Sequence, residues 1–135
     1  MTLFKGVRIT DTYFTGHKTA VLPTLTRSIS AICREDRGVS LFYIGIASGW
    51  DHEAALKRRI DDKKIFFGTT DMYLLYQSTS ETNTKEIESY LVDRFKDEKA
   101  DLRVWNSARG GGGRPGSGPF FFLYLALTRA TINAA

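Results

Sequence analysis

Two apolar runs in the first half of the chain predict neighbouring strands. Residues 28–34 and 39–47 are apolar and rich in β-branched side chains, and a polar turn sequence that ends in Gly38 separates them. A glycine can adopt the positive φ angle that a tight turn between antiparallel strands needs. We therefore expect the two runs to form a β-hairpin.

The period of the pattern then changes to that of a helix. Apolar residues at helical spacing predict one helix over about 48–64, with Ser48 or Asp51 as its N-terminal cap, and a second helix from Asn83 onward. Residues 72–78 and 120–127 return to strand composition, and the second of these runs is apolar enough for a buried strand.

The order of these segments indicates an α+β fold. We expect a small, mainly antiparallel central sheet of three core strands plus a C-terminal strand, flanked by helices, because the early connections are short. With 135 residues, 42% hydrophobic and 25% charged, the chain has the composition of one globular domain. We assign 1–135 to that domain and treat 1–27 as a less certain N-terminal extension.

Composition indicates the cellular compartment and the charge of a binding partner. Nineteen basic and fifteen acidic residues give a net charge of +4, which favours an anionic partner. The single cysteine, Cys33, has no partner for an intramolecular disulfide, which favours a reducing compartment. No apolar stretch approaches the roughly 20 residues of a membrane span, and the N-terminus lacks a signal-peptide core. We therefore expect a cytoplasmic protein with no membrane partner.

Two charged residues fall where a helix should be apolar. On a helical wheel Arg59 lies inside the apolar stripe of the first helix, whereas its neighbour Arg58 lies outside it. Glu88 lies inside the stripe of the second helix. A buried carboxylate needs a cation, hydrogen bonds or a metal ion. Two interpretations stay open: a salt bridge between Arg59 and Glu88, or a carboxylate that binds a metal ion at the rim of a cleft.

Phosphodiester hydrolysis is a reaction that uses such groups. Mg²⁺ often takes only one or two protein carboxylates, and water and phosphate complete its coordination. A guanidinium stabilises charge that develops on phosphate oxygens, and a tyrosine hydroxyl can orient or activate the attacking water.

The same residues belong to an ordered set of motifs. The set begins with Tyr43-Ile44-Gly45, followed by Arg59-Ile60 with Lys63 one turn later. Next comes Glu88, with aliphatic residues three and four positions after it, and finally Asn106 before a glycine-rich loop. In this order the motifs resemble the GIY-YIG nuclease family over roughly residues 28–127.

The resemblance implies a metal-dependent DNA endonuclease with a defined set of site residues. It implies Mg²⁺ (or Mn²⁺) on Glu88, Arg59 at the scissile phosphate, Tyr43 beside the attacking water and Asn106 holding the site. Lys63 occupies a basic position that serves either as a catalytic residue or as a solvated side chain. Target choice would come from loops, from DNA structure, or from a homodimer or partner protein, and a double-strand break would need a dimer or sequential nicking.

One family element is missing from its expected place. The family's first motif supplies a tyrosine beside that of the second motif, and in a short hairpin Ile32 or Cys33 would stand there instead. The other possibility is that Tyr13 reaches the site from an earlier strand. An alternative function follows from this departure: a catalytically inactive module that binds nucleic acid or a protein partner.

Several basic and aromatic residues are candidates for nucleic-acid contacts. Arginines and lysines can lie along phosphates, whereas exposed aromatic rings can stack on bases or simply fill a core. The basic candidates are Arg58, Lys64, Arg109 and Arg114, and the aromatic ones are Trp50 and Trp105.

Overall fold

The computed structural model describes residues 2–61, 68–106 and 119–129, which form an α+β fold around a five-stranded mixed sheet. The strands lie in the order β1-β2-β4-β5-β3, and three of their four pairings are antiparallel. Their bounds are β1 (Thr2–Phe4), β2 (Val7–Thr10), β3 (Val39–Gly49), β4 (Asp71–Ser78) and β5 (Phe120–Arg129). The helices are α1 (Lys18–Ile32), the 3₁₀ turn η1 (Glu35–Arg37), α2 (His52–Asp61), α3 (Glu81–Val92) and its π-helical continuation η2 (Asp93–Glu98).

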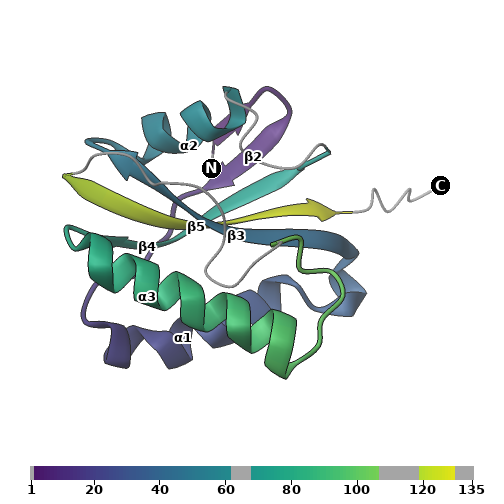
Figure 1. Ribbon diagram of the computed structural model, residues 1–135. Coiled ribbons are helices and arrows are strands. Elements are labelled where there is room, and N and C mark those ends of the chain that lie inside the picture. Colours follow the sequence, from purple (N-terminus) through teal and green to yellow (C-terminus); the bar gives the residue numbers. More distant parts are fainter. Residues whose placement is uncertain (1, 62–67, 107–118, 130–135) are drawn as a thin grey trace.

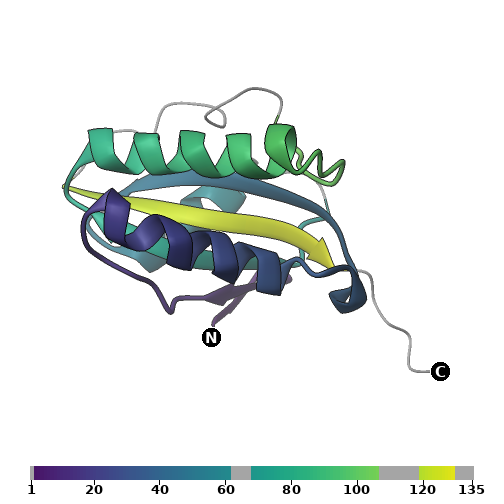
Figure 2. The ribbon, with the colours of Figure 1, turned by 90° about the horizontal axis from the view of Figure 1, so that it is seen from below.

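Helices cover both faces of the sheet. Helix α2 lies on one face, and α1 and α3 lie together on the other (Figures 1 and 2). Strand β5 runs antiparallel between β4 and β3, and its residues 121–127 are all buried. The predicted strands at 39–47, 72–78 and 120–127 are therefore confirmed, as are the two helices, whose N-termini are capped by Asp51 and Ser80.

The predicted hairpin is wrong, because residues 28–32 belong to helix α1. This helix buries Val21, Leu25 and Ile29, which recur at intervals of four on its inner side. Its β-branched residues and its internal Pro23 favour other structures locally, but burial of the apolar side in the core outweighs that preference. Strand β3 pairs with β5, 80 residues later in the chain, instead of with the segment before it.

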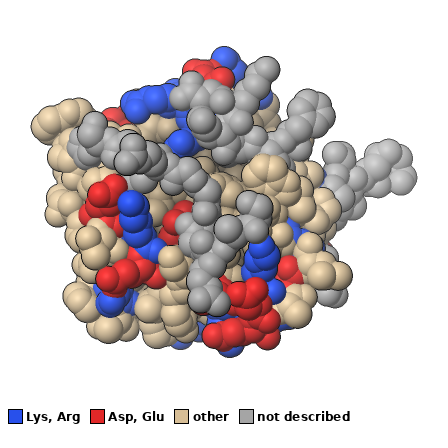
Figure 3. All heavy atoms as spheres, in the orientation of Figure 1, with Lys and Arg blue, Asp and Glu red and all other residues tan. Residues whose placement is uncertain are grey.

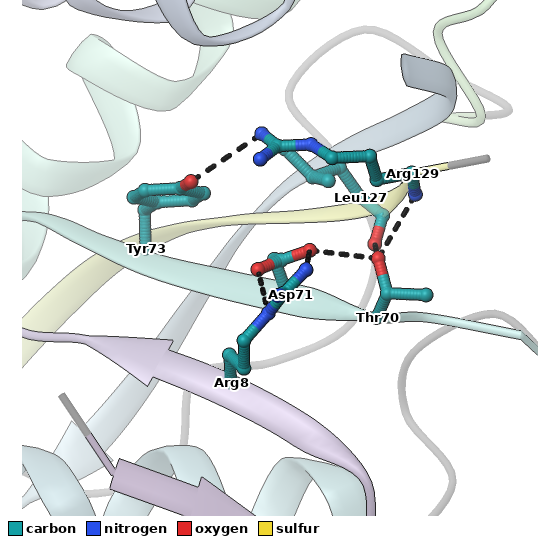
Figure 4. A network of polar contacts seen from close by, with 6 residues as sticks. All are labelled: Arg8, Thr70, Asp71, Tyr73, Leu127 and Arg129. Atoms are coloured by element: carbon teal, nitrogen blue, oxygen red, sulfur yellow. Dashed lines mark hydrogen bonds and ion pairs between the residues drawn. The ribbon is translucent and has the colours of Figure 1, made fainter. Parts of the chain in front are cut away.

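The segment that we separated as an N-terminal extension is part of the same sheet. Strand β2 pairs in parallel with β4, which makes the sheet mixed. At this junction Arg8 donates two hydrogen bonds to Asp71, at 2.8 and 3.1 Å, and Thr70 links Asp71 to the end of β5 (Figure 4). Within the described ranges, no helix has the length and apolar character required to cross a membrane.

Candidate active site

The candidate site is built around the outer edge of β3, the last strand of the sheet. Backbone groups of alternate residues in a strand point to the same edge. At Phe42 this edge is covered by the segment that precedes Asn106: the Phe42 N–H donates to the Arg103 carbonyl at 2.9 Å, and the Trp105 N–H donates to the Phe42 carbonyl at 2.7 Å. The chain after η2 thus extends the sheet by a short stretch.

The side chain of Asn106 covers the next position of the edge. Its Oδ1 accepts a hydrogen bond from the Ile44 N–H at 3.1 Å, and its Nδ2 donates to the Ile44 carbonyl at 2.8 Å. Asn106 is only 2% exposed, and Lys96 donates a hydrogen bond to its backbone carbonyl. Both functional atoms of the amide are therefore engaged with β3.

Arg59 reaches the third position of the same edge. Its Nη2 donates to the Ile46 carbonyl at 2.5 Å, so a side chain that starts on α2 extends to the rim of the sheet. This hydrogen bond explains why a charged residue, Arg59, lies inside the apolar stripe of α2. The guanidinium is held where the α2 layer meets the edge of β3.

Tyr43 lies beside a second tyrosine, Tyr124 of β5. The two ring centroids are 6.2 Å apart, and Gly45 is the register partner of Tyr124. A Cβ atom on Gly45 would lie 2.6 Å from the Tyr124 hydroxyl oxygen and 2.7 Å from Cε2 of Tyr43. Real Cβ atoms do not approach other atoms so closely, so the absent side chain of Gly45 leaves the space in which the two rings meet.

This finding corrects both expectations for the residue beside Tyr43. Ile32 ends helix α1, and Cys33 follows it in the core below the opposite face of the sheet, so neither residue is on a strand next to Tyr43. Burial also raises the pKa of the Cys33 thiol to about 12, which keeps it protonated. Tyr13 contacts His52 at the start of α2, with ring centroids 5.9 Å apart, and is not the partner of Tyr43.

Glu88 is a buried carboxylate without a partner in the described part of the chain. It is 5% exposed, and it has neither a hydrogen bond nor an ion pair there, so the interpretation of a salt bridge with Arg59 is wrong. Loss of solvation raises the pKa of Glu88 to about 8, and the positive charges of Lys85 and Arg59 oppose this rise. A carboxylate in this state can take up a proton or a cation.

Tyr124 lies within electrostatic reach of Tyr43, Arg59 and Glu88. Burial raises the pKa of Tyr124, and Tyr43 and Glu88 raise it further, whereas Arg59 lowers it. Arg59 comes from the helix on one face of the sheet and Glu88 from a helix on the other, and the sheet lies between these two helices (Figure 1). The site combines two phenolic hydroxyls, a guanidinium and a carboxylate.

Of the remaining basic candidates, only Arg58 belongs to the described residues. Arg58 is exposed on α2, on the side of Gly49, whereas Lys63, Lys64, Arg109 and Arg114 lie outside the described residues. The face shown in Figure 3 carries interspersed acidic and basic side chains, not a continuous field of one sign. Among the described residues, no group of three or more histidine, cysteine, aspartate or glutamate side chains could hold a metal ion. Glu88 is the buried carboxylate in this region that could contribute to a metal site.

Sequence reasoning missed Tyr124. It stands in the run from Phe120 to Leu127, whose apolar character predicts only a buried strand. The available signal was its place in the alternating pattern: Phe122, Tyr124 and Ala126 share one face of β5, so a polar hydroxyl is directed to the same layer as Tyr43.

Comparisons with known proteins leave the family open. No protein-family model, no curated protein and no solved structure matches this chain.

Proposed function

We propose that this chain is a metal-dependent DNA endonuclease of the GIY-YIG type, which hydrolyses phosphodiester bonds. The observation that carries the proposal is that Tyr43, Tyr124 and Arg59 gather at β3. Helix α3, which packs on the same strand, carries Glu88, a buried carboxylate with no partner among the described residues. The resemblance requires a tyrosine beside Tyr43, and Tyr124 supplies it. The strand that carries Tyr124 follows the other motifs in the chain instead of preceding them, so the proposed site has a permuted strand order.

Each side chain has a distinct task in this reaction. Arg59 stabilises the negative charge that grows on the phosphate oxygens in the transition state. Tyr43 assists the attacking water. Tyr124, whose raised pKa keeps its hydroxyl protonated, donates a hydrogen bond that orients the reacting groups. Asn106 holds the edge strand in place through Ile44.

Glu88 is suited to hold a divalent cation. Its carboxylate oxygens have no partner within residues 2–61, 68–106 and 119–129, and one carboxylate is a usual protein contribution to a Mg²⁺ site. Mg²⁺ or Mn²⁺ held by Glu88 would supply positive charge that stabilises the phosphate in the transition state. Because the ligand must be deprotonated, binding of the cation should strengthen as the pH rises toward the raised pKa of Glu88.

The alternative is an inactive module that binds nucleic acid or a protein through the same surface. It rests on the missing first-motif tyrosine, whereas the proximity of Tyr124 to Tyr43 supports the enzyme. The enzyme is therefore the function that the geometry supports best.

Cleavage of plasmid and branched DNA with Mg²⁺ or Mn²⁺ tests the proposal. We expect metal-dependent products from the wild type and none above background from Glu88→Gln. Arg59→Ala should lower the rate about 10²- to 10³-fold, the usual effect of removing one charge-stabilising donor. Tyr43→Phe and Tyr124→Phe should each reduce the rate with little change in stability.

Matched controls separate these effects from a general loss of structure. Glu81→Gln changes an exposed carboxylate on the same helix, and Tyr90→Phe removes an exposed hydroxyl, so both variants should cleave like the wild type. If no substrate yields a metal-dependent product while DNA binding persists, the proposal is wrong and the binding module takes its place.

A further inference from the structure

Trp105 occupies the rim of the candidate site as an anchored but accessible aromatic ring. Its indole meets the Tyr43 ring edge-to-face, with centroids 5.5 Å apart and planes at 73°. Its backbone is fixed to β3 by the 2.7 Å hydrogen bond to Phe42, and the next residue, Asn106, is bonded to Ile44. Even so, 48% of Trp105 is exposed.

The other tryptophan provides a contrast. Trp50 follows the end of β3, is 83% exposed and makes no ring contact with the described residues. About seven strand residues separate it along β3 from the position of Tyr43, or roughly 20 Å. Both residues are accessible, but only Trp105 is held against a side chain of the proposed reaction centre.

We propose that Trp105 is a stacking platform for an unpaired base of the nucleic-acid substrate, next to the phosphate that is cut. This inference rests on the proposed function and specifies its substrate class. A base inside a duplex already has neighbours on both faces, so a protein ring can stack on it only when the strand is single, branched or locally opened. A ring anchored beside Tyr43 therefore favours substrates that present an unpaired nucleotide at the site.

Stacking of this kind is strong and tolerates any sequence. Removal of one aromatic platform weakens binding of single strands by about 5- to 150-fold per base. It also leaves the phosphate contacts intact, so the dependence of affinity on salt should keep its slope. These two features distinguish a stacking residue from a residue that only supports the fold.

The two tryptophans allow a direct test in EDTA, where cleavage cannot interfere. Trp50→Phe leaves Trp105 as the only tryptophan, so the tryptophan emission of this variant reports on Trp105 alone. It is titrated with a short single-stranded oligonucleotide, a flap of the same sequence and the fully paired duplex. We expect strong quenching by the single strand and the flap, and little quenching by the duplex.

Two substitutions at position 105 complete the test. Trp105→Ala should bind the single strand about 5- to 150-fold more weakly with an unchanged salt slope, and Trp105→Phe should recover most of the affinity because it keeps a ring. Equal quenching by single strand and duplex, or wild-type binding by Trp105→Ala, would overturn the inference. So would a Trp105→Phe variant that binds as weakly as Trp105→Ala.

The outcome is separable from that of the cleavage assay. Stacking without metal-dependent cleavage would contradict the nuclease and leave Trp105 as a binding residue. Cleavage that is indifferent to Trp105→Ala on every substrate would preserve the nuclease and remove the stacking role.

Discussion

Gly45 provides the space in which the rings of Tyr43 and Tyr124 approach each other. We expect Gly45→Ala to displace at least one ring, because the new Cβ would lie within 2.7 Å of atoms of both side chains and these buried rings have little room to move. A displacement of about 1 Å in a reacting group can lower a rate 10²-fold. Cleavage rate and thermal unfolding of the variant, measured beside those of Tyr90→Phe, check this expectation. A fully active Gly45→Ala protein would contradict the placement of the two rings.

Glu88 should make the stability of the protein depend on pH. Its pKa is raised from 4.5 to about 8 by burial, so the folded state binds more protons than the unfolded state between these values. The contribution of Glu88 to the free energy of unfolding should therefore be highest below about pH 4.5. It should fall as the pH rises to about 8. Denaturant unfolding of the wild type and Glu88→Gln at about pH 5 and about pH 8 measures the difference, which should favour the variant at the higher pH.

Addition of Mg²⁺ at about pH 8 extends this test. A cation that binds only the folded protein through Glu88 stabilises the wild type by mass action and has no such effect on Glu88→Gln. An equal response of the two proteins would show that Glu88 does not hold the cation.

At the scale of single elements, α1 is the segment that sequence patterns describe least well. Proline in a helix interior lacks an N–H and clashes with the preceding turn, and threonine and isoleucine favour strands locally. The helix forms because its residues at intervals of four enter the core with α3. Strand β3 and helix α3 were predictable, since in both of them local pattern and tertiary packing favour the same structure.

Pro23 should lower the stability of the protein, and the other residues of α1 offset this loss. It is exposed, so Pro23→Ala removes no core packing and restores a helical hydrogen-bond donor. We expect a gain of about 1–3 kcal/mol in the free energy of unfolding. For a chain of this size that corresponds to a rise in Tm of roughly 3–5 °C per kcal/mol. Arg27→Ala, on the same exposed side of α1, is the control and should change Tm very little. A lower Tm for Pro23→Ala would show that the proline is accommodated without strain.

At the scale of the molecule, the order of strands could not be predicted from local patterns. Tyr43 was recognisable because it stands in a short motif, but its neighbour Tyr124 is about 80 residues away and pairs with it only through the register of β3 and β5. The inward positions of Arg59 and Glu88 were predictable, since both charges fall inside the apolar stripe of a helix. Which residues surround them depends on how the sheet is assembled.

The pair of Arg8 and Asp71 joins the N-terminal strand to the rest of the sheet. The Asp71 side chain is 6% exposed and lies between β2 and β5, so its loss leaves buried polar groups less well satisfied. We expect Asp71→Ala to lower the free energy of unfolding by about 1–3 kcal/mol, and hydrogen exchange should increase first in β1 and β2. Asp36→Ala is the matched control: the Arg34–Asp36 pair has a similar geometry but is exposed on both sides, and its loss should change stability little. Equal effects of the two substitutions would contradict a structural role for Asp71.

The covering of the β3 edge has a consequence for the behaviour of the protein at high concentration. An open edge strand offers unpaired N–H and C=O groups to a strand of another molecule and thereby promotes aggregation. In this chain the groups at Phe42, Ile44 and Ile46 are occupied in turn by a backbone segment, by Asn106 and by Arg59. The residues that line the proposed site therefore also shield this edge from strand pairing with another molecule, so a substitution of Asn106 or Arg59 would expose edge groups of β3 as well as alter the proposed site.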